Sequence, residues 1–306
     1  MNLFLYLFTY PFIWLFSRLP MRVLYIFSDM TYLLIFYVIK YRKNVVTHNL
    51  TTAFPDMTDK ELKQISKQFY NHFTDIMFES IKSIGINKDE ISKRYKYKNV
   101  ELLEELSKQG KGIILLGAHQ GNWEWLFNLP LFFSSIHVYA TYSALTNPYF
   151  DKIIRKARSK FGGTCVKTSE TNKLMLRNYL EKKSGLHILL SDQSPLVHKS
   201  FYWKDFFGIK LPVHTGAEML AKKLDFTVVY FSTKKIKRGY YISNFKLITD
   251  KPKEYKNFSI TDSYFKMLEE SIKQQPQFYL WTHRRFKHKN RYQEWLRNNK
   301  QNKKKM

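Results

Sequence analysis

Apolar residues follow two different spacings along this 306-residue chain, and the spacing predicts the elements. Between residues 59 and 84, apolar side chains recur every three or four positions, from Leu62 to Ile81. This spacing predicts one long amphipathic helix, which Gly85 ends. Further helices are predicted at 100–107, 147–160, 171–182 and 215–223. Short β-rich runs predict strands at 112–118, 136–142, 186–191, 226–233 and 240–248.

Strands and helices that alternate in this way predict an α/β layer fold. We find no internal repeat and no linker after about residue 45. We therefore expect one catalytic or binding domain over residues 46–298, between an N-terminal segment (1–45) and a basic tail (299–306). The lysines that end the tail are expected to be disordered.

The N-terminal segment holds two apolar runs, LFLYLFTYPFIWLF (3–16) and VLYIFSDMTYLLIFYVI (23–39). Each is shorter than the ~20 residues that span a bilayer as a helix. Pro11 is expected to kink the first, and Asp29 is a poor membrane residue in the second. Two core helices of a soluble protein are the alternative. The density of aromatic residues and the basic YRK that follows favour a membrane-bound helix or helical hairpin, with its basic flank in the cytoplasm.

The net charge of +26 indicates an anionic partner. Nucleic acid, an acidic membrane surface and an acidic carrier protein all satisfy this requirement, so charge does not choose among them. The single cysteine, Cys165, excludes an internal disulfide.

The stretch ILLGAHQGNWEW (114–125) carries the candidate chemistry. Five residues of helix turn through ~500°, which leaves His119 and Glu124 ~140° apart. The two side chains meet only if the chain bends at Gly121-Asn122, so we predict a strand, a turn and a helix with Glu124 in its first turn. A carboxylate beside one imidazole nitrogen then leaves the other free to remove a proton from a hydroxyl. The residues alone fit a catalytic pair and a capped helix start equally well.

The pattern of a histidine followed five positions later by an acid is short, and the chain contains a second match. His187 and Asp192 occur in HILLSD, within a β-rich run without a bend. We interpret His187 as a structural residue that faces the sheet.

Six blocks of the chain, in order, resemble the lipid A late acyltransferases, the lauroyl and myristoyl transferases of Gram-negative lipopolysaccharide synthesis. The blocks are YRKNVVTHNLTTAFPD (41–56), HQGNWEW (119–125), TNPYFD (146–151), LLSDQSP (189–195), FFGIKLPVHTGAEMLAKKL (206–224) and YLWTHRRFK (279–287). The resemblance covers nearly the whole chain.

This resemblance implies an inner-membrane enzyme whose α/β catalytic domain, with a central, mostly parallel sheet flanked by helices, lies on the cytoplasmic face. Such enzymes move an acyl chain from acyl carrier protein to a hydroxyl of a lipid A precursor, without a metal or dissociable cofactor. By this resemblance, His119 matches the general base and Glu124 its acidic partner. The candidate substrate-binding residues are Asn122, Trp123, Arg155, Arg158, Asp192, Gln193, Arg284 and Arg285.

In one place the chain departs from the family. Where the family often has Tyr-Arg before the Asn-Pro pair, this chain has Tyr142 and Ser143. We expect Arg155 or Arg158 to supply the missing cation, although a solvated basic helix explains both equally well. The departure leaves open another lysolipid or glycolipid acceptor. From a different class, a membrane-anchored nucleic-acid-binding protein fits the charge, but we recognise no nucleic-acid motif, and nucleic acid is not expected as a partner.

Overall fold

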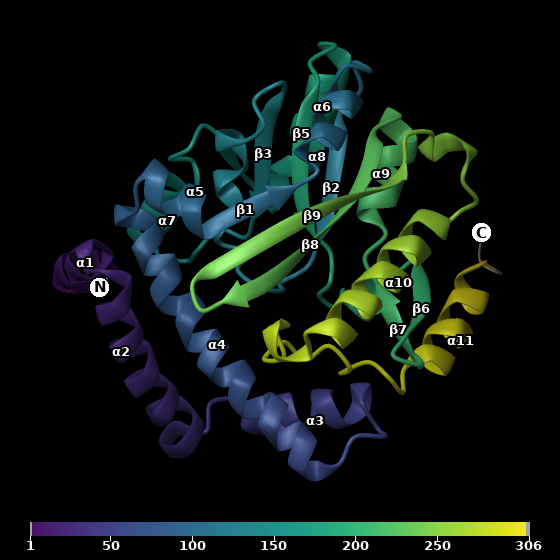
Figure 1. The fold of residues 1–306 in the computed structure, drawn as a ribbon. Helices are drawn as coiled ribbons and strands as arrows, with labels where there is room; N and C mark the ends of the chain where they lie inside the picture. The colour runs from purple at the N-terminus through teal and green to yellow at the C-terminus, as the bar shows by residue number, and fades with distance from the viewer. Residues whose placement is uncertain (1, 304–306) are drawn as a thin grey trace.

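A seven-stranded sheet forms the centre of the structure, a computed structural model that describes residues 2–303 (Figure 1). The strands lie in the order β1-β9-β8-β2-β5-β3-β4. Their bounds are β1 (Tyr95–Lys98), β2 (Ile113–Gly117), β3 (His137–Tyr142), β4 (Thr164–Lys167), β5 (Gly185–Leu190), β8 (Thr227–Lys237) and β9 (Tyr240–Thr249). All neighbours pair in parallel except β8 and β9, which form an antiparallel hairpin. The predicted α/β fold with a mostly parallel sheet is confirmed.

Both faces of the sheet are buried, as β2 shows. Ile114 and Leu116 face one apolar cluster, whereas Ile113 and Leu115 face another. The first cluster includes residues of α3 (Lys43–Ala53), α4 (Asp59–Gly85), α8 (Thr168–Leu180), α9 (Gly216–Leu224) and α10 (Ser259–Gln274). The second includes residues of α5 (Lys88–Arg94), α6 (Val100–Ser107) and the 3₁₀ helix η2 (Trp125–Leu131). A strand covered on both sides needs a continuous apolar sequence, which explains the IILL run of β2.

All five predicted strands and all five predicted helices are present, with ends that differ by a few residues. Several elements were not predicted: β1, β4, α3, α5, α10, the small antiparallel hairpin of β6 (Tyr202–Phe206) and β7 (Ile209–Val213), and α11 (Tyr292–Lys303). The strands among them are four or five residues long and partly polar, so they give no clear period. The predicted basic tail begins inside α11, which continues to Lys303. Residues 304–306, the end of the segment expected to be disordered, lie outside the described residues.

The long helix α4 links the N-terminal segment to the sheet. A capping box starts it: the Thr58 hydroxyl accepts from the Glu61 backbone N–H, and the Glu61 carboxylate accepts from the Thr58 backbone N–H. Its buried face carries apolar residues of the predicted pattern, such as Leu62 and Phe69, and also ionisable residues that include His72, Asp75 and Glu79. Buried ionisable groups need partners, so these residues mark where α4 contacts a polar part of the fold.

Two helices precede α3 and α4: α1 (Asn2–Arg18) and α2 (Met21–Leu33), which continues as a π-helix (Leu34–Ile39). Both contact α4, and α2 runs beside it (Figure 1). Helix α1 continues through Pro11. The stretch Met21–Ile39 is 19 residues long and apolar enough to cross a membrane, and only 17% of its most apolar window is buried. Because most of its apolar side chains point away from the protein, it differs from a buried core helix of a soluble protein.

Candidate active site

Three polar residues lie just beyond the ends of three adjacent strands. His119 follows β2, Asp192 follows β5 and Ser143 follows β3. These strands are parallel neighbours, so their carboxyl ends meet at one edge of the sheet. Open α/β sheets commonly bind ligands at this edge.

A cavity of about 620 Å³ lies at this edge. Its polar lining includes His119, Glu124, Ser143, Arg158, Gln193 and His214. Leucine, isoleucine, phenylalanine and alanine side chains supply the apolar part of the wall, including Leu126, Phe127, Ile188 and Leu220. A cavity wall that combines apolar side chains with convergent polar groups is typical of a small-molecule site.

His119, which lines this cavity, forms a pair with the buried carboxylate of Asp192. His119 Nδ1 lies 2.8 Å from Asp192 Oδ1, and the side chains are 21% and 2% exposed. Burial opposes protonation of the imidazole, but the charge and hydrogen bond of Asp192 outweigh it and raise the pKa of His119. Burial also opposes ionisation of Asp192, but His119 outweighs that effect and lowers the pKa of the carboxyl. The contact with Asp192 holds the imidazole in one orientation through Nδ1, an arrangement that suits a general base acting through Nε2.

The prediction that Glu124 is the carboxylate at the imidazole was wrong in its geometry. Glu124 lies immediately before η2 instead of inside its first turn, and its carboxylate accepts hydrogen bonds from Arg158. The bend at Gly121-Asn122 occurs as expected, but it directs Glu124 toward α7 (Pro148–Arg158). Asp192, which we had proposed among the substrate-binding residues, occupies the position at Nδ1.

His187, the histidine five residues before Asp192, is buried in β5. Its ring stacks against Tyr139 at 5.0 Å and against Phe226 at 5.9 Å between ring centroids. Burial lowers the pKa of His187 to about 4, so this ring is neutral at pH 7. The interpretation of His187 as structural is confirmed.

Arg158 brings a cation into the cavity. Its Nη2 lies 2.6 Å from Glu124 Oε1 and its Nε 2.9 Å from Glu124 Oε2, and its guanidinium lies over the ring of Phe127. Arg155, the other candidate, pairs with Asp151 and is 48% exposed. Of the two predicted cations, only Arg158 lines the cavity with Ser143.

The loop that carries His119 is fixed from two sides. Gly121 has a φ of 61°, and its N–H donates to the Phe278 carbonyl, while the Leu280 N–H donates to the His119 carbonyl. A Cβ at Gly121 would lie 2.8 Å from the Thr233 methyl, so glycine is required there for two reasons. From α4, His72 Nε2 lies 3.1 Å from the Gly121 carbonyl.

Asn122 belongs to this support and does not line the cavity. Its amide donates to Glu79 at 2.6 Å, and its carbonyl accepts from the Trp125 N–H at 2.9 Å. The residue is fully buried, so the prediction that it contacts substrate was wrong. Trp123 does line the cavity, with its ring edge against His119 at 5.4 Å between centroids.

The two C-terminal candidates, Arg284 and Arg285, lie in different environments. Arg285 is 1% exposed, with its guanidinium over Phe206 and Phe265 and a hydrogen bond to Ser194. It is therefore a core residue and not a surface contact for phosphate or a carrier protein. Arg284 is exposed and lines a different hollow, with His48 and Lys287.

Residues that we did not single out also line the cavity, including His214, Thr168 and Asn172. Their sequence context gave no signal, because they come from segments that approach His119 only in the folded chain. Over residues 2–303, no three His, Cys, Asp or Glu side chains cluster as a metal site.

The fold and the site define an α/β enzyme with a histidine–carboxylate pair at the carboxyl edge of its sheet. Residues 2–288 match the family described as bacterial lipid A biosynthesis acyltransferase. The chain belongs to this family.

A relative from Haemophilus influenzae, named lipid A biosynthesis acyltransferase, is 25% identical over 178 residues. The aligned region is 57% of this chain and 54% of that protein, so the match spans about half of each. It supports the family at low identity and leaves the substrates to be inferred from the site.

We predict that Asp192→Asn moves the acid limb of kcat/KM to lower pH. The carboxylate raises the pKa of His119, so its loss lowers that pKa and the neutral base persists at lower pH. Turnover should also fall, by ~10²-fold or more, because the ring loses its orientation. The pH profiles of kcat/KM for wild type and Asp192→Asn would check this. Glu124→Gln is the matched control and should shift the limb less; a larger shift than for Asp192→Asn would make Glu124 the dominant partner.

Proposed function

We propose that this protein transfers a fatty acyl chain from acyl carrier protein to a hydroxyl of a lipid A precursor. The observation that carries the proposal is His119, paired with the buried Asp192, in a cavity that combines apolar side chains with polar groups including Arg158. Family membership supports acyl transfer in lipid A synthesis. The apolar wall suits an acyl chain, and the polar end suits its reacting carbonyl.

In the proposed reaction, His119 Nε2 takes the proton from the acceptor hydroxyl as its oxygen attacks the thioester carbonyl. Asp192 at Nδ1 holds the ring and stabilises the imidazolium that forms. A new C–O bond forms, and negative charge develops on the carbonyl oxygen. When the intermediate collapses, the C–S bond breaks and the proton passes to the departing sulfur. The products are the acyl ester and the carrier thiol.

Arg158 is the group we assign to the developing oxyanion. It lines the same cavity as His119, and the Glu124 ion pair together with Phe127 fixes its orientation. Glu124 is then a positioning residue for Arg158, and its charge also contributes to the raised pKa of His119. Ser143, where the family often has arginine, adds a neutral hydroxyl to the cavity lining.

We place the enzyme in the inner membrane with its catalytic domain on the cytoplasmic face. The apolar stretch Met21–Ile39 supports membrane association, and acyl carrier protein is a cytoplasmic donor. The acceptor class rests on the family, and another glycolipid or lysolipid hydroxyl fits the same cavity. The cavity chemistry favours an enzyme over a nucleic-acid-binding protein, because binding nucleic acid does not require a histidine–carboxylate pair.

We expect His119→Ala to lower transfer by at least ~10²–10⁴-fold, the usual effect of losing a general base. Product formation by the purified membrane protein would be followed with acyl carrier protein as donor. His187→Ala is the control, because that histidine is buried away from the cavity and should affect stability alone. Near-normal turnover by His119→Ala would overturn the mechanism.

For Arg158→Ala, we expect kcat to fall by ~10²–10³-fold at saturating donor and acceptor, the effect typical of losing an oxyanion donor. Arg155→Ala is the matched control, because Arg155 pairs with Asp151 and lies outside the cavity. A rise in KM with an unchanged kcat would make Arg158 a docking residue instead.

Transfer from acyl carrier protein should weaken as salt rises. The chain carries a net charge of +26, and salt screens exposed opposite charges beyond a Debye length of ~10 Å at 0.1 M. A small acyl thioester without the carrier should depend less on salt. The ratio of kcat/KM for the two donors, measured across ionic strength, checks this; equal slopes would remove the carrier from the proposal.

A further inference from the structure

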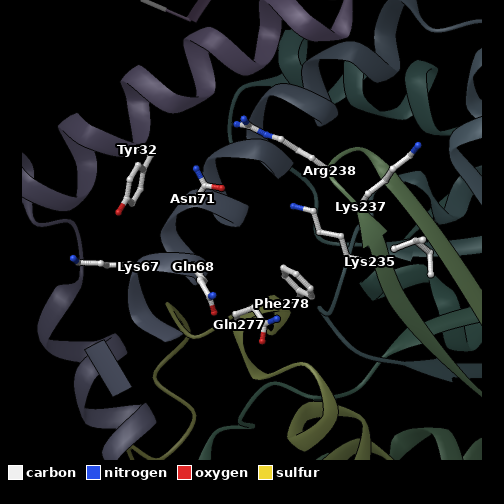
Figure 2. Close-up of a pocket in the computed structure, with 10 residues that line it drawn as sticks. Tyr32, Lys67, Gln68, Asn71, Lys235, Lys237, Arg238, Gln277 and Phe278 are labelled. Carbon is white, nitrogen blue, oxygen red and sulfur yellow. The ribbon is translucent and has the colours of Figure 1, made fainter. Parts of the chain in front are cut away.

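A second cavity, of about 480 Å³, lies between the N-terminal helices and the sheet. Its wall comes from α2, α4, the turn of the β8–β9 hairpin and the 3₁₀ helix η5 (Pro276–Phe278) (Figure 2). None of its lining residues lines the His119 cavity. The proposed reaction therefore assigns it no role.

Four cationic side chains line this second cavity: Lys67 from α4, and Lys235, Lys237 and Arg238 from the hairpin. Two carboxylates balance part of this charge, since Lys235 pairs with Asp75, and Arg238 with both Asp75 and Asp29. Among residues 2–303, no carboxylate forms an ion pair with Lys67 or Lys237. The cavity therefore has an excess of positive charge.

A third carboxyl lies deeper and adds little negative charge. Burial, followed by the charge of Asp75, raises the pKa of Glu79 to about 7. At neutral pH this group carries only part of a charge, so it leaves the cationic excess of the cavity in place.

The position of the cavity relates this charge to a membrane. Tyr32, part of its wall, belongs to the apolar stretch Met21–Ile39. On the same stretch, Met30 is 61% exposed and Leu33 54% exposed, and Ile236 at the hairpin turn is 65% exposed. Cations thus lie directly beside outward-facing apolar side chains. This arrangement matches the boundary where lipid headgroups meet acyl chains.

We propose that this cavity binds the phosphate group of an anionic membrane lipid, whose acyl chains lie along α2. The proposal rests on the membrane placement of α2 in the proposed function. Lysine ammonium groups and the amide of Gln68 are suitable phosphate donors, whereas the Asn71 amide already donates to Asp29. Lys235 and Asn71 face the open centre, whereas Lys67 and Lys237 stand at its rim with their ends directed outward (Figure 2). Their flexible four-carbon stems allow both ammonium groups to turn toward a bound anion.

The inner wall of the cavity also supports the active-site loop. Substitutions that test binding must therefore avoid the residues of this wall. Lys235 Nζ lies 3.2 Å from His72 Nδ1, and His72 contacts the Gly121 carbonyl. Substitution of Lys235 or Arg238 would leave Asp75 buried without its full set of partners. Lys67 and Lys237 lie outside this support, so their loss tests binding without disturbing the loop.

The test measures lipid binding to the full chain in nonionic detergent by native mass spectrometry. The probes are phosphatidylglycerol, which is anionic, and phosphatidylcholine, which has no net charge. We compare wild type with Lys67→Gln/Lys237→Gln and with a control of equal charge change, Lys223→Gln/Lys253→Gln. Lys223 of α9 and Lys253 of the 3₁₀ helix Pro252–Glu254 are exposed lysines, and neither lines the second cavity. The thermal transition of each variant verifies that it is folded.

We expect wild type and the control to retain phosphatidylglycerol in preference to phosphatidylcholine. The Lys67/Lys237 variant should bind phosphatidylglycerol about 25-fold more weakly, since each lysine near an anionic surface is worth about fivefold. Equal losses of phosphatidylglycerol binding in the two double variants would mean that overall charge causes the effect, and would overturn the proposed site. Equal binding of both lipids by wild type would also overturn it, while leaving membrane insertion of α2 in place.

Inorganic phosphate distinguishes the two sources of the ligand. If millimolar phosphate displaces the lipid from wild type, the cavity recognises free phosphate and the assignment to a lipid is wrong. Failure of the proposed reaction would be detected separately, because His119→Ala removes transfer but should leave lipid retention unchanged. The two proposals therefore fail in different assays.

Discussion

The parallel pairing of β2 with β5 is the constraint on which the site depends. Gly117 stands opposite Leu190 at the end of this ladder, and the Ser191 N–H donates to the Gly117 carbonyl just beyond it. His119 and Asp192 each follow two residues after these paired positions, so they lie level with each other. Each strand is buried on both faces, which fixes the register, because a shift by one residue would exchange the two apolar faces. The same packing that stabilises the sheet therefore sets the 2.8 Å contact between base and carboxylate.

A buried polar cluster on α4 supports the loop that follows β2 at the carboxyl edge of the sheet. His72, Asp75 and Glu79 lie on successive turns of one helical face, and each is almost fully buried. Glu79 holds Asn122 and His72 contacts Gly121, while Asp75 pairs with the hairpin cations. Loss of one partner in such a cluster leaves a charge or donor unsatisfied, at a typical cost of about 3–5 kcal/mol. Since α4 also contacts α1 and α2, one helix joins the N-terminal helices to the loop that carries His119.

Glu124 and Arg158 show how closeness in sequence can predict the wrong contact partner. Glu124 follows His119 by five positions, and closeness in sequence made them look like partners. In the structure, Glu124 forms an ion pair with Arg158 of α7, whereas His119 pairs with Asp192, which follows the neighbouring strand β5. All four side chains are grouped at the same end of the sheet. The site therefore contains the predicted residue types, but they pair differently from the prediction. The charge of Glu124 still acts on His119 through space.

The sequence by itself determined the elements whose periods are long or fully apolar, including α4, β2 and β5, and hence the α/β class. It also determined that His119 stands beyond a buried strand, because an apolar run followed by a polar residue and a glycine turn is a local signal. Only the tertiary structure decided that Asp192 contacts His119, that Arg158 lines the cavity and Arg155 does not, and that Arg285 is a core residue. Strand order and helix orientation depend on contacts between segments far apart in the chain, and no local spacing encodes them.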